Sequence, residues 1–204
     1  MPSTDPRHDL ARPDWGPWLI AFVLLTGSIT YARAMAPAAR DVRAFGGQVL
    51  IPLPPGWSSH ENTQGEHPTF VAQVPTIEGL SPTMRVEPVE AHDESGTGAL
   101  FRDLEVARMQ EARASEGVGY RVLDIDERQP EEGPQSTWVW YALVRDPPNV
   151  APGAAVLPVV VLGVDVLVTT GAGHAWHVAA SQPARGGPDD KDTLRRLVEG
   201  LRFL

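Results

Sequence analysis

Cysteine is missing from this 204-residue chain, and lysine occurs once, as Lys191. Without cysteine the chain can form no disulfide, no thiolate zinc site, no lipid-modified cysteine and no cysteine nucleophile. The net charge is −9 and the sequence pI is near 5.1. A nucleic-acid surface needs clustered cations, so this charge balance argues against a nucleic-acid partner.

Motifs of enzyme active sites are also scarce. Residues 56–60, GWSSH, lack the second glycine of a nucleophile elbow, and the serine follows a proline-rich turn. Residues 171–173, GAG, begin like a dinucleotide-binding loop but lack its third glycine, so they predict a hairpin turn. We therefore expect no catalytic residues, no cofactor and no enzymatic activity.

One uncharged run stands out near the N-terminus. Residues 15–32, WGPWLIAFVLLTGSITYA, contain no charge, and a helix of that length spans roughly 27 Å, close to a hydrocarbon core of about 30 Å. Aromatic side chains at its two ends fit the membrane interfaces. The run predicts a single membrane anchor whose contact residues are Trp15, Trp18, Phe22, Leu25 and Tyr31.

This anchor divides the chain into a tail (1–14), a transmembrane segment or uncleaved signal (15–33), a linker (34–46) and one domain (47–204). The alternative is a cleaved signal peptide, with residues 19–25 as its apolar region and cleavage near 32–34. Acidic residues offset the two arginines of the tail, which favours the anchor. Three arginines just after the run favour a cytoplasmic domain by the positive-inside rule.

Hydrophobic periodicity in the remaining chain predicts seven strands and two helices. The expected order is three strands, a helix, four strands and a final helix, which is typical of an α+β fold with an antiparallel sheet. The strands are expected at 48–51, 69–74, 83–89, 120–127, 136–144, 156–170 and 174–181, and the helices at 99–116 and 188–201. Residues 58–67 are expected to form a polar loop.

Three of these elements carry more detailed expectations. The strand at 136–144 is apolar on both faces and should be central, and Gly163 should mark a bulge or bend. The last helix should face the sheet through Leu194, Leu197, Val198 and Leu201. The first helix should do so through a stripe made of Leu100, Leu104, Ala107, Glu111 and Ala114.

The opening strand and turn, VLIPLPPGW at 49–57, resemble those of PsbP-like domains. The ending is also similar, with a glycine turn, a strand at 174–181 and a helix that finishes in LRF. The resemblance covers residues 45–204. It implies a central antiparallel sheet flanked by helices, in an exported or lumenal protein that docks on a membrane complex or in a bacterial lipoprotein. Here the lipobox cysteine is missing, so the lipoprotein form does not carry over.

Few residues qualify as binding sites. His60, His67 and His92 lie beside carboxylates in predicted loops and are weak candidate metal ligands, with a solvated polar loop surface as the favoured interpretation. His174 and His177 are three residues apart in a strand, so they should point to opposite faces. Trp57, His174 and Trp176 form a candidate interaction surface, although for Trp57 we favour burial as the hydrophobic plug of its turn over a place on that surface.

These observations predict a membrane-anchored, extracytoplasmic binding module that acts as an accessory or assembly subunit of a membrane protein complex, of photosynthetic or respiratory type. Its expected partners are the membrane and other membrane-protein subunits, and its location is the inner membrane with the domain in the periplasm. We follow the resemblance over the arginine count, because long domains translocate largely regardless of charge. The alternatives are a periplasmic small-ligand or metal-binding protein, or a hydrolase with a pocket between sheet and helices.

Overall fold

The computed structural model describes Phe22 and residues 39–63, 67–75, 80–90, 99–129, 134–146, 157–170, 174–187 and 189–204. The chain divides into two compact units, Met1–Ala36 and Pro37–Leu204, and the second contains every strand described below. The predicted anchor at 15–32 lies outside the described residues except for Phe22. No helix within the described ranges is both long enough and apolar enough to cross a membrane.

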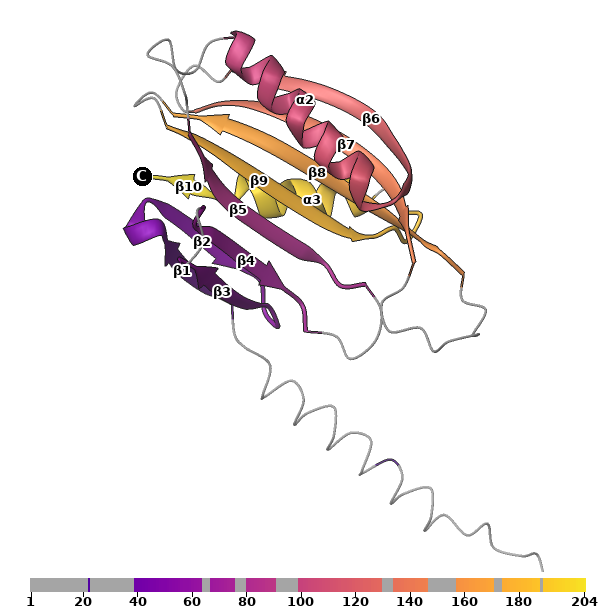
Figure 1. Cartoon of the computed structure of the whole chain (residues 1–204). Coiled ribbons are helices and arrows are strands. Elements are labelled where there is room, and N and C mark those ends of the chain that lie inside the picture. Colours follow the sequence, from indigo (N-terminus) through magenta and orange to yellow (C-terminus); the bar gives the residue numbers. More distant parts are fainter. Residues whose placement is uncertain are drawn as a thin grey trace, which may run out of the picture. The chain divides into compact units, whose positions relative to one another are not determined.

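A seven-stranded antiparallel sheet forms the centre of the second unit, in the order β3-β4-β5-β9-β8-β7-β6 (Figure 1). Its strands are β3 (Ser58–Asn62), β4 (Thr69–Gln73), β5 (Thr83–Val89), β6 (Val118–Arg128), β7 (Gln135–Arg145), β8 (Val159–Thr169) and β9 (Ala175–Pro183). The predicted antiparallel α+β architecture is confirmed. Strand β7 pairs with β6 on one side and β8 on the other, as its two apolar faces predicted.

A second, three-stranded sheet in the order β1-β2-β10 packs with helix α3 (Asp189–Glu199) against one face of the large sheet. Its strands are β1 (Arg40–Ala44), β2 (Val49–Leu53) and β10 (Arg202–Phe203), and the short 3-10 turn η1 (Phe45–Gly47) links the first two. The main core lies between these layers. The four residues predicted for the last helix, Leu194, Leu197, Val198 and Leu201, are all buried in it.

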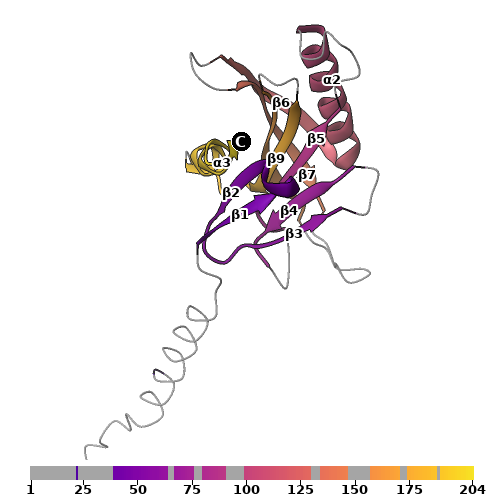
Figure 2. The same cartoon turned by 90° about the vertical axis from the view of Figure 1, so that its left-hand side faces the viewer.

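Helix α2 (Ala99–Glu116) lies on the opposite face of the large sheet, so the sheet separates the two helices (Figure 2). Its bounds match the prediction, but the predicted stripe is wrong: Leu104 is 50% exposed, and Ala107, Glu111 and Ala114 are exposed as well. The helix packs through Phe101, which was expected to flank the stripe, and through Val106 and Met109, which were not part of the prediction. The buried face ends in a charged residue, Arg113, and hydrophobicity alone cannot recognise such a face.

Two stretches expected to lack regular structure contain strands. Strand β1 lies in the predicted linker 34–46, where its register with β2 buries Ala44 completely. Strand β3 lies in the predicted polar loop at the edge of the large sheet. Its side chains are tied to neighbours, for example Glu61, which accepts a hydrogen bond from the Phe45 backbone N–H at 3.0 Å. An exposed edge strand needs no apolar face, so its polar sequence gave no strand signal.

The predicted bulge at Gly163 is also wrong, since β8 keeps a continuous register with both β7 and β9. Gly163 is paired with Tyr141, whose ring lies over it. A Cβ at this position would lie 2.7 Å from Tyr141 Cε2. The glycine therefore makes room for a large side chain and does not bend the strand.

Candidate functional site

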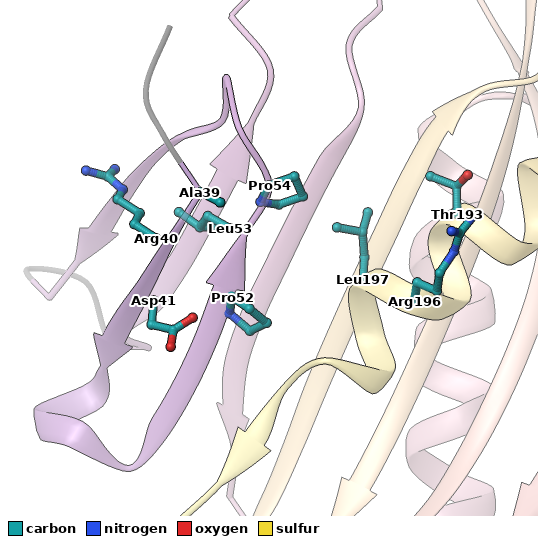
Figure 3. Close-up of a pocket in the computed structure, with 9 residues that line it drawn as sticks. All are labelled: Ala39, Arg40, Asp41, Pro52, Leu53, Pro54, Thr193, Arg196 and Leu197. Carbon is teal, nitrogen blue, oxygen red and sulfur yellow. The ribbon is translucent and has the colours of Figure 1, made fainter.

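A groove with a volume of about 720 Å³ lies between α3 and the β1–β2 hairpin (Figure 3). We call it the α3 groove. It is lined by Ala39, Arg40, Asp41, Pro52, Leu53, Pro54, Thr193, Arg196 and Leu197.

The groove depends on how closely the end of α3 approaches the hairpin. A Cβ on Gly200, just after α3, would lie 2.9 Å from Pro52 Cγ, so only glycine allows this approach. Pro52 has no backbone N–H to donate, and it lies beyond the short pairing of β10 with Val49 and Leu50. Proline therefore fits β2 at this position, because β10 needs no hydrogen bond from the backbone of residue 52.

Apolar side chains make the floor of the groove and charged ones make its rim. Leu53 and Leu197 are buried, and Leu197 points from α3 toward the hairpin in Figure 3. Arg40, Asp41 and Arg196 are exposed at the edges. An apolar floor with a mixed-charge rim suits the burial of an apolar segment of a partner whose own charges meet the rim.

The opposite face of the large sheet, under α2, carries a buried charge network. Its centre is Asp165 on β8, whose side chain is 1% exposed. Arg113 of α2 donates from Nε to Asp165 Oδ2 at 2.9 Å and from Nη2 to Oδ1 at 2.9 Å. This bidentate pair joins the helix to the middle of the sheet.

The network continues from Asp165 across two more strands. The ring of His177 on β9 bonds Asp165 Oδ1 through Nε2 at 3.1 Å and Glu87 Oε1 through Nδ1 at 2.9 Å. On β5, Glu87 also pairs with Arg85 at 2.6 Å. Ionised carboxylates only accept hydrogen bonds, so this arrangement favours the imidazolium form of His177, in which both ring nitrogens donate.

The pKa values follow from this pairing. Burial alone would lower the pKa of His177, but its hydrogen bonds to Asp165 and Glu87 outweigh burial and raise the pKa above its ordinary value. Burial would raise the pKa of Asp165, and the hydrogen bonds from His177 and Arg113 lower it instead. The pKa of Glu87 is lowered in the same way, with His177 as its main partner. Each of the three shifts favours the charged form of its group.

The proposed interaction surface is wrong for its two tryptophans. Trp57 and Trp176 are 6% and 5% exposed and belong to the main core, so Trp57 is the hydrophobic plug that was the favoured interpretation for this residue. Only His174 is exposed. The structure thus moves the candidate surface away from these residues to the α3 groove.

The candidate metal ligands do not come together. His60 is exposed on β3 and His67 is exposed just before β4, while His92 lies outside the described residues. Within the described ranges, no three histidine, aspartate or glutamate side chains are grouped so that they could hold a metal ion. Of the predicted anchor residues Trp15, Trp18, Phe22, Leu25 and Tyr31, the structure describes only Phe22.

Sequence reasoning missed the charge network. One signal was available, because Asp165 stands alone in a run of valines and leucines, and a charge in a buried strand requires a partner. That partner, Arg113, is 52 residues away in the chain. Without an observed fold, nothing in the sequence singles out this arginine among the others.

No known family model matches this sequence, and no curated protein sequence matches it either. Similarity to solved structures is clear at the level of the fold. The solution structure of cyanobacterial PsbP from Synechocystis sp. PCC 6803 matches with a TM-score of 0.54 at 11% identity, covering 82% of this chain and 93% of that chain. The Ran-binding protein Mog1p of Saccharomyces cerevisiae matches with a TM-score of 0.49 at 14% identity, covering 82% and 96%. The predicted PsbP-like resemblance is thereby confirmed as a PsbP-like fold.

Proposed function

We propose that this chain is a membrane-anchored binding module, and that its PsbP-like domain serves outside the cytoplasm as an accessory or assembly subunit of a membrane protein complex. The α3 groove is the observation that carries the proposal. It offers a partner an apolar floor bordered by Arg40, Asp41 and Arg196. The proposed role is binding and requires no catalysis.

The groove fits a partner segment better than it fits a reacting substrate. Its only hydroxyl side chain, that of Thr193, donates to the Asp189 carbonyl at 2.9 Å within the helix. Its only carboxylate, that of Asp41, has no second acid among the lining residues to serve as a general acid–base partner. A short apolar segment of a partner would cover Leu197 and Pro54 further. An acidic group on that segment would form an ion pair with Arg196 at the rim.

The membrane part of the proposal rests on the sequence. The uncharged run at 15–32 is long enough for one crossing, and glycine and small residues within it suit packing against other membrane helices. A domain held at the membrane meets a membrane-embedded partner at a high effective concentration, so a modest groove is sufficient.

Site-specific photo-crosslinking in the native membrane tests the groove. A photoreactive residue in place of Thr193, which lines the groove, should give a crosslinked product of one constant mass, whereas one in place of exposed Arg121 on β6 should not. Arg196→Glu should abolish that product. Arg195→Glu, one position along α3 and outside the groove lining, is the matched control and should leave the product intact. Equal products from positions 193 and 121, or no effect of Arg196→Glu, would refute the groove as the binding surface.

A reporter fusion tests the location separately. A reporter active only in the periplasm should work when fused after Leu204, and one active only in the cytoplasm should not. The opposite result would end the extracytoplasmic proposal. Extraction behaviour adds a further test: an anchored chain resists alkaline carbonate washing of membranes, whereas a chain cleaved near residue 34 is released.

A further inference from the structure

A second, smaller cavity lies beside the charge network, near the end of α2. Its volume is about 220 Å³, and residues of α2, β4, β5, β7, β8 and β9 line it. Liquid water occupies about 30 Å³ per molecule, so the cavity has room for about seven waters or one small organic molecule. We call it the arginine cavity.

Three arginines and one carboxylate line this cavity: Arg85, Arg113, Arg145 and Glu116. The lining therefore carries a charge of +2, from three cations and one anion, although the whole chain has a net charge of −9. Asp165 and Glu87 lie next to this lining, where each is ion-paired with an arginine and bonds the His177 ring. A concave site with excess positive charge in an acidic protein favours an anionic ligand.

One of these arginines has a donor that lacks a partner. Arg145 pairs with Glu116 through Nη2, but its Nε is buried and has no hydrogen-bond partner among the described residues. A buried donor without a partner destabilises the fold, so it calls for an explanation. Arg113, in contrast, already uses Nε, Nη1 and Nη2 on Asp165 and Glu116.

Two hydroxyl groups in the lining add a further donor. Thr83 Oγ1 and Ser181 Oγ lie 3.0 Å apart and share one hydrogen bond. A shared bond consumes only one of the two O–H groups, so the pair keeps one hydroxyl proton for a ligand. Thr83 and Ser181 face each other across β5 and β9, which fixes their positions.

Apart from Tyr141, which carries a hydroxyl group, the remaining walls are apolar, among them Val71, Leu143 and Val161. A fully hydrated inorganic anion would gain nothing from these walls. A molecule with a carboxylate at one end and a short hydrocarbon body would satisfy both kinds of surface.

We propose that the arginine cavity binds a small organic carboxylate, with its carboxylate against Arg85, Arg145 and the Thr83–Ser181 hydroxyls and its hydrocarbon body against Leu143 and Val161. This site is separate from the α3 groove, since the two share no lining residue and lie on opposite faces of the large sheet. The proposal does not depend on the partner-binding role.

Titration of the full chain in a non-ionic detergent with butyrate tests the proposal. Calorimetry should show saturable binding, and the backbone amide NMR signals of Thr83 and Ser181 should shift along the same isotherm. Butyramide has the same shape without the charge and should bind at least tenfold more weakly, because about 1.5 kcal/mol or more is lost with each charged hydrogen bond. Equal binding of butyramide would overturn the proposal, as would the absence of saturable butyrate binding.

Variants and a second anion sharpen the test. Arg145→Gln should weaken butyrate binding by about tenfold. Arg85→Gln should weaken it too, and because Arg85 is 54% exposed its loss leaves the folded sheet intact. Arg121→Gln, an exposed arginine outside the cavity, should bind butyrate as the wild type does. Unchanged binding by both cavity variants would overturn the site, and tighter binding of inorganic phosphate than of butyrate would overturn the assignment to organic acids. Crosslinking at Thr193 should be unaffected throughout.

Discussion

Asp165→Asn is the substitution that most directly tests how the buried network holds α2 on the sheet. Asparagine keeps the size of the side chain but removes the negative charge that Arg113 and His177 share. Both cations would then face a neutral amide in a site where Asp165 is 1% exposed. We expect the folded state to lose stability because a buried charge is left without its counter-ion.

The size of the loss follows from what remains paired. Removing one partner of a buried ion pair costs about 3–5 kcal/mol. Arg113 keeps its ion pair with Glu116 at 2.5 Å and its side chain is 14% exposed, so the lower end applies and we expect a loss of about 3 kcal/mol. For a domain of this size 1 kcal/mol corresponds to about 2–4 °C, so Tm should fall by about 6–12 °C.

Urea unfolding followed by tryptophan fluorescence measures this loss at neutral pH. Asp124→Asn, an exposed aspartate on β6, is the control and should change the unfolding free energy by less than about 0.5 kcal/mol. Arg113→Met combined with Asp165→Asn should cost less than the sum of the two single substitutions, because removing both charges leaves neither unpaired. A loss below about 1 kcal/mol for Asp165→Asn, or strict additivity of the two substitutions, would refute the reasoning.

Three further predictions concern the same face of the sheet. Gly163→Ala should destabilise the fold by about 1–3 kcal/mol, because the new methyl group would overlap the Tyr141 ring. The double substitution Gly163→Ala with Tyr141→Leu should cost less than the sum of the two single substitutions. A Gly163→Ala variant as stable as the wild type would contradict this geometry. Met109→Ala should lower the free energy of unfolding by about 2–5 kcal/mol and Leu104→Ala by less than about 0.5 kcal/mol, both measured by denaturant unfolding. The reverse order would support the predicted helix stripe. The raised pKa of His177 stabilises the fold fully below the ordinary histidine pKa, and this stability is lost as pH rises through the raised value. The lowered pKa values of Asp165 and Glu87 stabilise the fold fully above the ordinary carboxylate pKa, and this stability is lost as pH falls through the lowered values. Urea midpoints should therefore be highest between about pH 4.5 and 6.5, and His177→Gln should remove the alkaline decline; an unchanged decline would assign it to another group.

Much of the fold follows from local pattern. Strand β5 and helix α2 have the predicted bounds, and the four apolar residues expected to be buried in and just after α3 are buried. Each of these features depends on a periodicity that neighbouring residues alone create. The PsbP-like resemblance also depends on local motifs. The turn after β2 and the last hairpin are each formed by residues that are neighbours in the sequence.

The candidate sites were less predictable, for a different reason. Trp57 and Trp176 looked suited to a partner surface, but their exposure is decided by layers contributed from distant parts of the chain. The α3 groove needs Pro52 beside Gly200, and the arginine cavity needs Arg85, Arg113 and Arg145 from three elements. No spacing rule connects residues that far apart.

The sequence by itself therefore determined the α+β class, the order of two helices and seven of the ten described strands, and the uncharged run at 15–32, because each is written in consecutive residues. It did not reveal strands β1, β3 and β10. Only the tertiary structure decided which face of α2 is buried, why Gly163 is a glycine and how Asp165 is neutralised. Hydrophobicity is a property of one side chain, whereas the stability of a buried charge is a property of a pair. The partner of Asp165 is found only when α2 lies on the sheet.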